Sequence, residues 1–283
     1  MKDCDTKMPK IHPSAVIHDD TRLADDITIG PNCVIDSEVS IGAGATLEAN
    51  VVINKDVTIG NNNHFFANCV IGGRPQLLGL NANEPIGGLV IGDNNIFREQ
   101  VTIHPSIYEG KFTTIGNDNL LMIGVHIGHD CTLEDKIVMS NYSQISGHCR
   151  IETGVWLSGM VLLHQFVTLG KWCYAAGFAG INKDVPPFLV VSGHYPPKVR
   201  GVNKRGMNRA GLSRQQQENI YQAYKTLYRQ GGALLENARA MAQSSGGCLT
   251  AENMLDENVR AMIDMITKSS EQRYGRYLEK FRH

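Results

Sequence analysis

The chain has few aromatic residues, no long apolar run and almost no net charge. Aromatic residues make up 7% of its 283 residues, and 27 Lys and Arg nearly balance 28 Asp and Glu, which leaves a formal charge of -1. This balance gives no global reason to expect binding to nucleic acid or to an anionic membrane. No apolar stretch approaches the roughly 20 residues that a membrane span requires. We therefore expect no nucleic-acid partner and no stable membrane insertion.

A secretory signal and paired cysteine motifs are also missing. The first residues are Met-Lys-Asp-Cys-Asp, without a basic region followed by an apolar stretch, so we expect a cytoplasmic protein. The 7 cysteines are odd in number and include no Cys-x-x-Cys pair, which argues against a disulfide framework and a zinc ribbon. We expect most of them to be reduced and buried. No Gly-x-Ser-x-Gly elbow, P-loop or dinucleotide-binding fingerprint is evident.

What the chain does have is 29 glycines and a repeat of six residues. An apolar anchor recurs at every sixth position from Ile11 to Ile71, from Ile91 to Ile103 and from Ile115 to Ile181. This period does not fit an α-helix or a meander of hairpins, but it fits a parallel β-helix in which three short strands and three turns make one coil. Gly often follows the anchor, as in Ile29-Gly30, where we expect a turn that needs a permissive backbone.

Two interruptions of the register predict loops, at residues 73–90 and 104–114. Loops on a rigid scaffold often carry binding residues, although neutral surface decoration is the alternative. The repeat ends at Asp184-Val185-Pro186-Pro187, where two prolines remove N–H donors that another coil would need. The sequence thus predicts an N-terminal extension over 1–10, a β-helix over 11–190 and a helical domain over 191–283.

Helical patterns begin at Ser213, which suits a capping box with Gln216. Apolar residues then follow at helical spacing: Ile220, Ala223, Tyr224, Leu227 and Tyr228. A further helix is predicted from Ala251 to about Lys268, and its apolar face would comprise Met254, Leu255, Val259, Met262, Ile263 and Ile266. Helices at this end would cover the exposed β edge of the last coil.

Histidines gather within two coils of the repeat, as His126, His129, His148 and His164. His129 and His148 are 19 residues apart, one coil plus one residue, so we expect them on the same side of adjacent coils. A core needs no histidine, so the cluster predicts a site, and general-base chemistry is its simplest use. Asp130 could orient His129, and Gln165 suits a polar ligand, although both could be ordinary turn residues. Zinc binding by histidines of adjacent coils stays open.

A second candidate feature is electrostatic. No acidic residue lies between Asp184 and Glu218, and this segment contains six basic residues that we call the basic patch: Lys198, Arg200, Lys204, Arg205, Arg209 and Arg214. Such a patch suits a phosphate-bearing ligand or an acidic carrier protein. A solvated basic linker is the alternative.

Several segments occur in an order that is more specific than the repeat itself. They are residues 119–131 (NLLMIGVHIGHDC), Ser146-Gly147-His148, Leu163-His164-Gln165-Phe166, Lys183-Asp184-Val185-Pro186-Pro187 and Gly201-Val202-Asn203. With these segments the chain closely resembles the UDP-N-acetylglucosamine acyltransferases of lipid A biosynthesis. The resemblance implies a mainly β fold, a left-handed parallel β-helix followed by a C-terminal α-helical domain. It also implies a homotrimer with sites between neighbouring subunits.

The activity implied by the resemblance is transfer of a fatty acyl chain from acyl carrier protein to the 3-position of UDP-N-acetylglucosamine. The carrier's phosphopantetheine thioester is the donor substrate, so no further cofactor and no metal are expected. His129 would be the general base, with Asp130 beside it, and the backbone N–H of Gly147 would stabilise the oxyanion. The basic patch would attract the acidic carrier protein.

Substrate-binding roles are implied for eight further residues. They are His126, His148, His164 and Gln165 in the sugar and acyl pocket, Gly177 where acyl-chain length is limited, Asn203 and Arg209 at the uridine diphosphate, and Gln76 in the cleft.

The chain departs from the family pattern at positions that concern both substrates. An acid and a lysine usually follow the glutamine, but here the run is Gln76-Leu77-Leu78-Gly79. Arg205 stands at a glutamate position, and Ala210 stands where a second arginine is common. One alternative is therefore a divergent paralogue that acylates another nucleotide sugar or uses an unhydroxylated chain. Others are a trimeric metalloenzyme resembling the γ-class carbonic anhydrases and a non-enzymatic scaffold.

Overall fold

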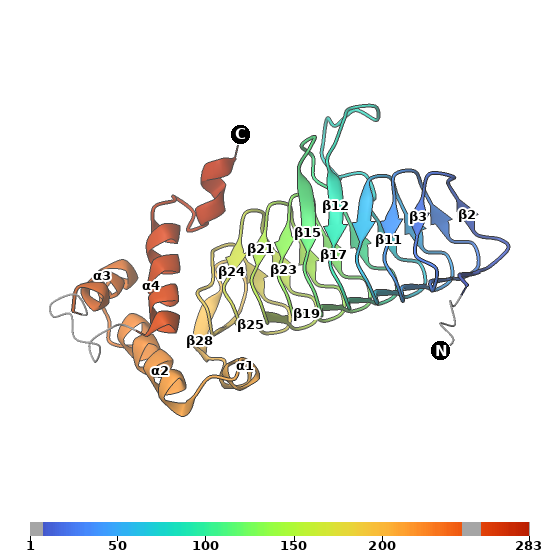
Figure 1. Cartoon of the computed structure of the whole chain (residues 1–283). Coiled ribbons are helices and arrows are strands. Elements are labelled where there is room, and N and C mark those ends of the chain that lie inside the picture. Colours follow the sequence, from blue (N-terminus) through green and yellow to red (C-terminus); the bar gives the residue numbers. More distant parts are fainter. Residues whose placement is uncertain (1–7, 245–255, 283) are drawn as a thin grey trace. The chain divides into compact units, whose positions relative to one another are not determined.

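The structure is a computed structural model that describes residues 8–244 and 256–282. It divides into two compact units, residues 1–148 and 149–283. Figure 1 shows the first unit in blue to green as a stack of short strands, and the helices of the second unit in orange and red.

The first unit is a parallel β-helix built from strands of two to four residues. The strands are β1 (Lys10–Ile11), β2 (Val16–Ile17), β3 (Arg22–Leu23), β4 (Thr28–Ile29), β5 (Val34–Ile35), β6 (Ser40–Ile41), β7 (Thr46–Leu47), β8 (Val52–Ile53), β9 (Val57–Ile59), β10 (His64–Phe65), β11 (Val70–Ile71), β12 (Gly88–Ile91), β13 (Ile96–Phe97), β14 (Thr102–Ile103), β15 (Phe112–Ile115), β16 (Leu120–Leu121), β17 (His126–Ile127), β18 (Thr132–Leu133), β19 (Val138–Met139) and β20 (Gln144–Ile145). Every third strand pairs in parallel, so the orders are β1-β4-β7-β10-β13-β16-β19, β2-β5-β8-β11-β14-β17-β20 and β3-β6-β9-β12-β15-β18. The predicted fold class, a left-handed parallel β-helix followed by helices, is confirmed.

The hexapeptide anchors fill the interior of the coils. Anchors of adjacent coils stack directly, as Ile35 on Ile53 and Phe65 on Phe97, and all four are buried. Ile11 is 41% exposed, because it lies in the first strand of the described residues. Each fully buried aliphatic contributes on the order of 1.5–3 kcal/mol, so this column supplies the main stabilisation of the repeat.

Most glycines after the anchors serve close packing between coils, which corrects the prediction that they provide a permissive turn. Gly72, which follows Ile71, is the exception, with a φ of 76°. The left-handed backbone falls three residues after the anchor, for example at Asn32 (φ 56°). A Cβ on Gly30 would lie 2.8 Å from the backbone carbon of Glu48, and one on Gly60 would lie 2.8 Å from the carbonyl oxygen of Gly92. Glycine is needed there because the next coil leaves no room for a side chain.

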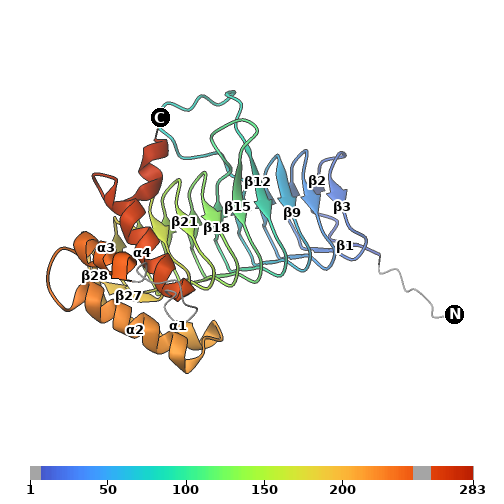
Figure 2. The same cartoon turned by 60° about the vertical axis from the view of Figure 1, so that its left-hand side comes forward.

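Two segments leave the coils of the first unit and project beside β12 and β15 (Figures 1 and 2). The first loop, residues 72–87, joins β11 to β12, and the second loop, residues 104–111, joins β14 to β15. Both are shorter than the ranges 73–90 and 104–114 that the repeat predicts. The reason is that β12 and β15 are four-residue strands, which pair from Gly88 with Phe112 to Ile91 with Ile115.

The second unit contains further coil strands, an antiparallel hairpin and the helices. Its strands are β21 (Arg150–Ile151), β22 (Trp156–Leu157), β23 (Leu162–Leu163), β24 (Thr168–Leu169), β25 (Tyr174–Ala175), β26 (Gly180–Ile181), β27 (Leu189–Ser192) and β28 (Lys198–Val202). β27 pairs in parallel with β25 and antiparallel with β28, so β structure continues past the predicted boundary at residue 190.

No helix in the described ranges is both long and apolar enough to cross a membrane.

Within residues 203–244 and 256–282, four α-helices and a short 3-10 helix follow the hairpin. They are α1 (Lys204–Arg209), α2 (Arg214–Tyr228), α3 (Leu234–Ser244), α4 (Glu257–Ser270) and η2 (Tyr277–Phe281). The predicted capping box of Ser213 and Gln216 starts α2. α4 begins after the N-cap Asp256, and its buried face includes Val259, Met262, Ile263 and Ile266. The predicted start of this helix, with Ala251, Met254 and Leu255, lies outside the described residues.

The cysteines within the described ranges are buried free thiols, as expected: Cys33, Cys69, Cys131, Cys149 and Cys173. Cys4 and Cys248 lie outside these ranges. Burial raises the pKa of the Cys69 thiol to about 12, so this thiol stays protonated and unreactive at neutral pH.

Candidate active site

His129 and Asp130 form a hydrogen-bonded pair in the turn after β17. Asp130 has a left-handed backbone (φ 59°), and its Oδ2 lies 2.7 Å from Nδ1 of His129. A carboxylate can only accept, so Nδ1 of His129 carries the proton. In the neutral ring, Nε2 then has a free lone pair, which is the arrangement of a general base. The structure thus places Asp130 toward His129, which the sequence left open.

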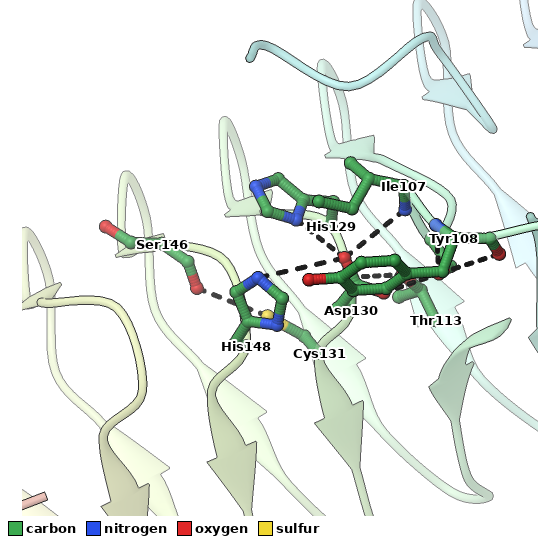
Figure 3. Close-up of polar contacts among 9 residues, drawn as sticks. Ile107, Tyr108, Thr113, His129, Asp130, Cys131, Ser146 and His148 are labelled. Carbon is green, nitrogen blue, oxygen red and sulfur yellow. Dashed lines mark hydrogen bonds and ion pairs between the residues drawn. The ribbon is translucent and has the colours of Figure 1, made fainter. Parts of the chain in front are cut away.

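Groups of the second loop and of β15 hold Asp130 in place. The Ser106 hydroxyl donates to Oδ1 (2.5 Å), the Ile107 N–H donates to Oδ2 (3.3 Å), and the N–H of Asp130 donates to Oγ1 of Thr113 (2.8 Å). Burial raises the pKa of Asp130, but the hydrogen bonds from His129, Ser106 and Ile107 outweigh it and leave the pKa below its usual value. Asp130 is therefore an anion at neutral pH. Figure 3 shows dashed contacts from His129 and Ile107 to its carboxylate.

His148 faces His129 from the adjacent coil, as the spacing of 19 residues predicts. The two rings are 4.9 Å apart and nearly perpendicular, at 89°. The N–H of His148 donates to the carbonyl oxygen of His129 (2.9 Å), and its Nε2 lies 4.0 Å from Oδ2 of Asp130. Figure 3 shows a dashed line from each of the two rings to this carboxylate.

Gly147 lies directly against the imidazole of His129. A Cβ on Gly147 would lie 2.7 Å from both Cε1 and Nε2 of the ring. On the other side, a Cβ on Gly128 would lie 2.7 Å from the backbone nitrogen of Gly147. The lack of side chains at Gly128 and Gly147 thus lets the backbone of Gly147 come close to Nε2 of His129, the atom that would accept a proton. One reacting group could therefore contact both the Gly147 backbone and Nε2.

His126 and His104 form a second pair beside His129. The Nδ1 of His126 lies 2.9 Å from Oγ1 of Thr102, and its ring lies 5.1 Å from that of His104. His104 is buried and donates from Nδ1 to the carbonyl oxygen of Gly73 (2.6 Å). Burial, with further effects of His104 and His129, lowers the pKa of His126 to about 4. Burial also lowers the pKa of His104.

We expect the chain to lose stability as the pH falls from about 6.5 to about 4. In this range the unfolded chain binds a proton at His126, whereas the folded state keeps this ring neutral. The lowered pKa of His104 acts in the same direction. The free energy of unfolding therefore falls as the pH falls. Urea unfolding followed by circular dichroism at several pH values measures this, and His126→Gln should flatten the profile. A profile of the same slope in that variant would contradict the assignment to His126.

Sequence reasoning missed His104, Ser106 and Thr113. His104 directly follows an anchor, and Thr102 pairs with His126 one coil later, so the register itself could have placed His104 near the cluster. Ser106 lies in a segment predicted as a loop. Its contact with Asp130 depends on the course of that loop, for which the sequence carried no signal.

The second unit holds His164, Gln165 and Gly177. His164 and Gln165 are half-buried in the turn after β23, and Nδ1 of His164 lies 3.2 Å from the carbonyl oxygen of Gln165. Gly177 is exposed in the turn after β25. A Cβ there would meet nothing closer than the carbonyl oxygen of Gly159 at 3.5 Å, so the space beside Gly177 is open.

Asn203 and Arg209 lie at one pocket of the second unit. The pocket has a volume of about 570 Å³ and is lined by Trp156, Ser158, Tyr174, Asn203, Arg205, Asn208 and Arg209. The guanidinium of Arg209 lies 4.7 Å from the centre of the Trp156 ring and 5.7 Å from that of Trp172. Asn203 caps α1, because its Oδ1 accepts from the Gly206 N–H (3.0 Å) and its Nδ2 donates to the carbonyl oxygen of Trp172 (2.8 Å). Arg205 and Arg209 are thus the cations of this pocket, and Asn203 shapes it.

The remaining predicted residues lie on exposed surfaces. Gln76 is exposed in the first loop of the first unit, and its neighbours Leu77 and Leu78 are exposed as well. All six members of the basic patch are exposed in the second unit. They are therefore accessible to a partner, whatever its chemistry.

A metal ion could be held by His129, Asp130 and His148. One ligand atom from each lies within 4.8 Å of the others, and two imidazoles with a carboxylate suit zinc. However, Oδ2 of Asp130 accepts from His129 and Ile107, and Oδ1 accepts from Ser106. A metal would have to replace part of this network, so the donor set fits an oriented imidazole better than a metal.

Comparison with known proteins bears on which chemistry this arrangement performs. Residues 184–275 match the family described as "Udp N-acetylglucosamine O-acyltransferase; Domain 2". The chain is 40% identical over 263 residues to the acyl-[acyl-carrier-protein]--UDP-N-acetylglucosamine O-acyltransferase of Stenotrophomonas maltophilia (strain R551-3), covering 91% of this chain and 95% of that protein. It is 46% identical over 232 residues to the protein of that name from Aliivibrio fischeri (strain MJ11), covering 80% and 86%.

Solved structures give the same result. The UDP-N-acetylglucosamine acyltransferase of Francisella novicida matches with a TM-score of 0.84 and 34% identity, over 94% of this chain and 92% of that one. The acyltransferase of Campylobacter jejuni matches with a TM-score of 0.81 and 32% identity, over 91% and 96%.

Proposed function

Because the chain belongs to the family of UDP-N-acetylglucosamine O-acyltransferases, we propose that it moves a fatty acyl chain from acyl carrier protein to the 3-position of UDP-N-acetylglucosamine. This is the reaction of the first step of lipid A biosynthesis, and it makes the chain an acyltransferase of the EC 2.3.1 class. The His129–Asp130 pair carries the proposal. A neutral imidazole with a free Nε2, oriented by an anion, is what removal of a proton from a sugar hydroxyl requires.

The residues of the first unit suit each step of this reaction. His129 takes the proton of the sugar 3-hydroxyl as that oxygen attacks the carbonyl carbon of the thioester. Asp130, already ionised, stabilises the imidazolium that forms. The backbone N–H of Gly147 stabilises the oxyanion of the tetrahedral intermediate. When the carbon–sulfur bond breaks, the leaving thiolate takes the proton from His129, which restores the neutral base.

Substrate roles are assigned to residues on both units. On the first unit, His126 and His148 border the base and suit the sugar and the acyl carbonyl, and Gln76 on the first loop is accessible to a ligand. On the second unit, His164, Gln165 and the open space beside Gly177 suit the acyl chain. The reaction needs no resident cofactor, since the phosphopantetheine of the carrier brings the acyl group.

Arg209 suits the nucleotide of the acceptor. Its guanidinium can pair with a phosphate, and the Trp156 ring beneath it gives a flat apolar wall. We expect Arg209→Ala to raise the KM for the UDP-sugar about 10- to 100-fold with a smaller change in kcat. Initial rates over a range of UDP-sugar concentrations measure this. The control is Lys225→Ala, which removes a cation stacked on Tyr221 of α2 outside the pocket. An unchanged KM for Arg209→Ala would remove Arg209 from the nucleotide site.

Acyl carrier protein and a homotrimer are the proposed partners. The exposed basic patch suits an acidic carrier. Apolar side chains that the coils leave exposed suit contacts between copies, for example Tyr142 in the first unit and Met160 in the second. Light scattering of the purified protein tests the trimer, and a monomer would contradict it. The cytoplasmic location stays a prediction.

Mass spectrometry of the products tests the function itself. Purified protein is mixed with acyl carrier proteins that carry hydroxylated or plain chains of several lengths, each with a panel of UDP-hexosamines. One added acyl group on UDP-N-acetylglucosamine supports the proposal, and no turnover with any UDP-hexosamine would contradict it.

The divergent-paralogue alternative is favoured by exposed Leu77 and Leu78 in the first loop, and it predicts turnover of another sugar or of plain chains only. The metalloenzyme alternative predicts stoichiometric zinc and CO₂ hydration that chelation abolishes.

A further inference from the structure

We propose that Ser106 is a positioning residue that directs the Asp130 carboxylate toward His129 and so prepares the base. The inference rests on the proposed function, because it assigns a residue to the same proton transfer. Its basis is a chain of hydrogen bonds from Ser106 through Asp130 to His129.

The direction of the Ser106 hydroxyl follows from its surroundings. Ser106 is fully buried, with 0% of its surface exposed. Its Oγ accepts from the N–H of Tyr108 at 3.0 Å, so the hydroxyl proton points elsewhere. Two acceptors are in reach, Oδ1 of Asp130 at 2.5 Å and the carbonyl oxygen of Tyr108 at 3.3 Å. The carboxylate is nearer and charged, so the hydroxyl donates to it.

This hydrogen bond decides which histidine Asp130 serves. His129 and His148 both border the carboxylate, with Nδ1 of His129 at 2.7 Å and Nε2 of His148 at 4.0 Å from Oδ2. Ser106 holds Oδ1, and the Ile107 N–H contacts Oδ2, which together fix the plane of the carboxylate. Without the hydroxyl, the carboxylate can turn toward His148, and His129 then loses its fixed tautomer and orientation.

The backbone around Ser106 is held firmly enough for this role. The N–H of Ser106 donates to the carbonyl oxygen of Gly88 (3.2 Å), and its carbonyl oxygen accepts from the N–H of Gly87 (3.0 Å). A Cβ on Gly87 would lie 2.9 Å from Cβ of Ser106, so the two backbones are in close contact. The second loop is thus tied to the start of β12, and the hydroxyl is presented from a fixed position.

The first test compares three substitutions of Ser106 in steady-state kinetics. Ser106→Ala is expected to lower kcat about 10- to 100-fold, the range of a charge-assisted hydrogen bond realised in the transition state. The KM for the UDP-sugar should change by less than about twofold. Ser106→Thr keeps the hydroxyl and should restore most of kcat. Ser106→Cys fills a similar space with a weak donor and should resemble Ser106→Ala.

The control for loss of a buried hydroxyl is Ser143→Ala. Ser143 is also 0% exposed and donates to the carbonyl oxygen of Ser140 (2.9 Å), so its substitution removes another buried hydroxyl without touching Asp130. Thermal unfolding of all variants separates folding from catalysis. If Ser106→Ala fails to fold, the comparison of Ser106→Thr with Ser106→Cys still decides, because Thr keeps a hydroxyl donor and Cys offers only a weak one.

A double-mutant cycle makes the test specific for action through Asp130. In an Asp130→Ala background, Ser106→Ala should lower kcat no further. Equal losses in both backgrounds, or wild-type kcat for Ser106→Ala, would overturn the inference while leaving the proposed function standing. Absence of turnover by the wild-type chain would instead reject the proposed function, and the inference would fall with it.

Discussion

Replacement of His129 by alanine is expected to lower kcat by about 10²- to 10⁴-fold, the usual contribution of a general base, while the β-helix stays folded. The imidazole lies outside the stack of anchors, with 16% of its side chain exposed, so its loss leaves no cavity between the anchors. Single-turnover rates with acyl carrier protein and UDP-N-acetylglucosamine measure the loss, and circular dichroism checks the fold.

The matched control for this variant is His18→Ala. Nδ1 of His18 lies 2.7 Å from Oδ1 of Asp20, the same distance as in the His129–Asp130 pair, but the His18 pair is exposed at the start of the coils. Its removal should leave kcat unchanged. A fully active His129→Ala would contradict the general-base assignment, and it is what the non-enzymatic scaffold predicts.

The β-helix could be predicted from the sequence because its determinants are local and repeated. Each anchor fills the same inward-facing position as the anchor 18 residues later, so the pairing of Ile35 with Ile53 follows from the period alone. The juxtaposition of His129 and His148 follows in the same way, as one coil plus one residue. Handedness could not be derived, because coils of either hand have the same spacing of anchors, and it came from the family resemblance.

Some features could not be predicted from the sequence, because they depend on the distance between the backbones of adjacent coils or on the course of a loop. Gly30 reads as a turn residue, and only the distance to the next coil shows that it makes room for Glu48. Ser106 lies off the repeat, so no period relates it to Asp130. Asn203 matches a ligand contact by resemblance, whereas its side chain caps α1, a use that depends on where the helix begins.

Gly147→Ala is expected to lower kcat by about 10²-fold or more, close to the loss of an oxyanion donor. The new Cβ would lie 2.7 Å from Cε1 and Nε2 of His129, nearer than a Cβ can lie to either atom. Asp130 holds the ring from the other side, so either the imidazole leaves its hydrogen bond or the Gly147 backbone retreats. Both outcomes separate the base from the oxyanion donor. Steady-state kcat and KM, with thermal unfolding, measure the effect.

Gly201→Ala is the control for adding a methyl group, because no atom lies within 4 Å of a Cβ at this position and its φ is not among the positive ones. It should keep wild-type kcat. Gly147 also has no positive φ, so backbone strain does not confound its variant. Since Gly147→Ala and His129→Ala disable the same step, the double variant should lose little more activity than His129→Ala alone. Additive losses, or a Gly147→Ala variant with wild-type kcat, would show that the backbone of Gly147 does not share the reacting group with His129.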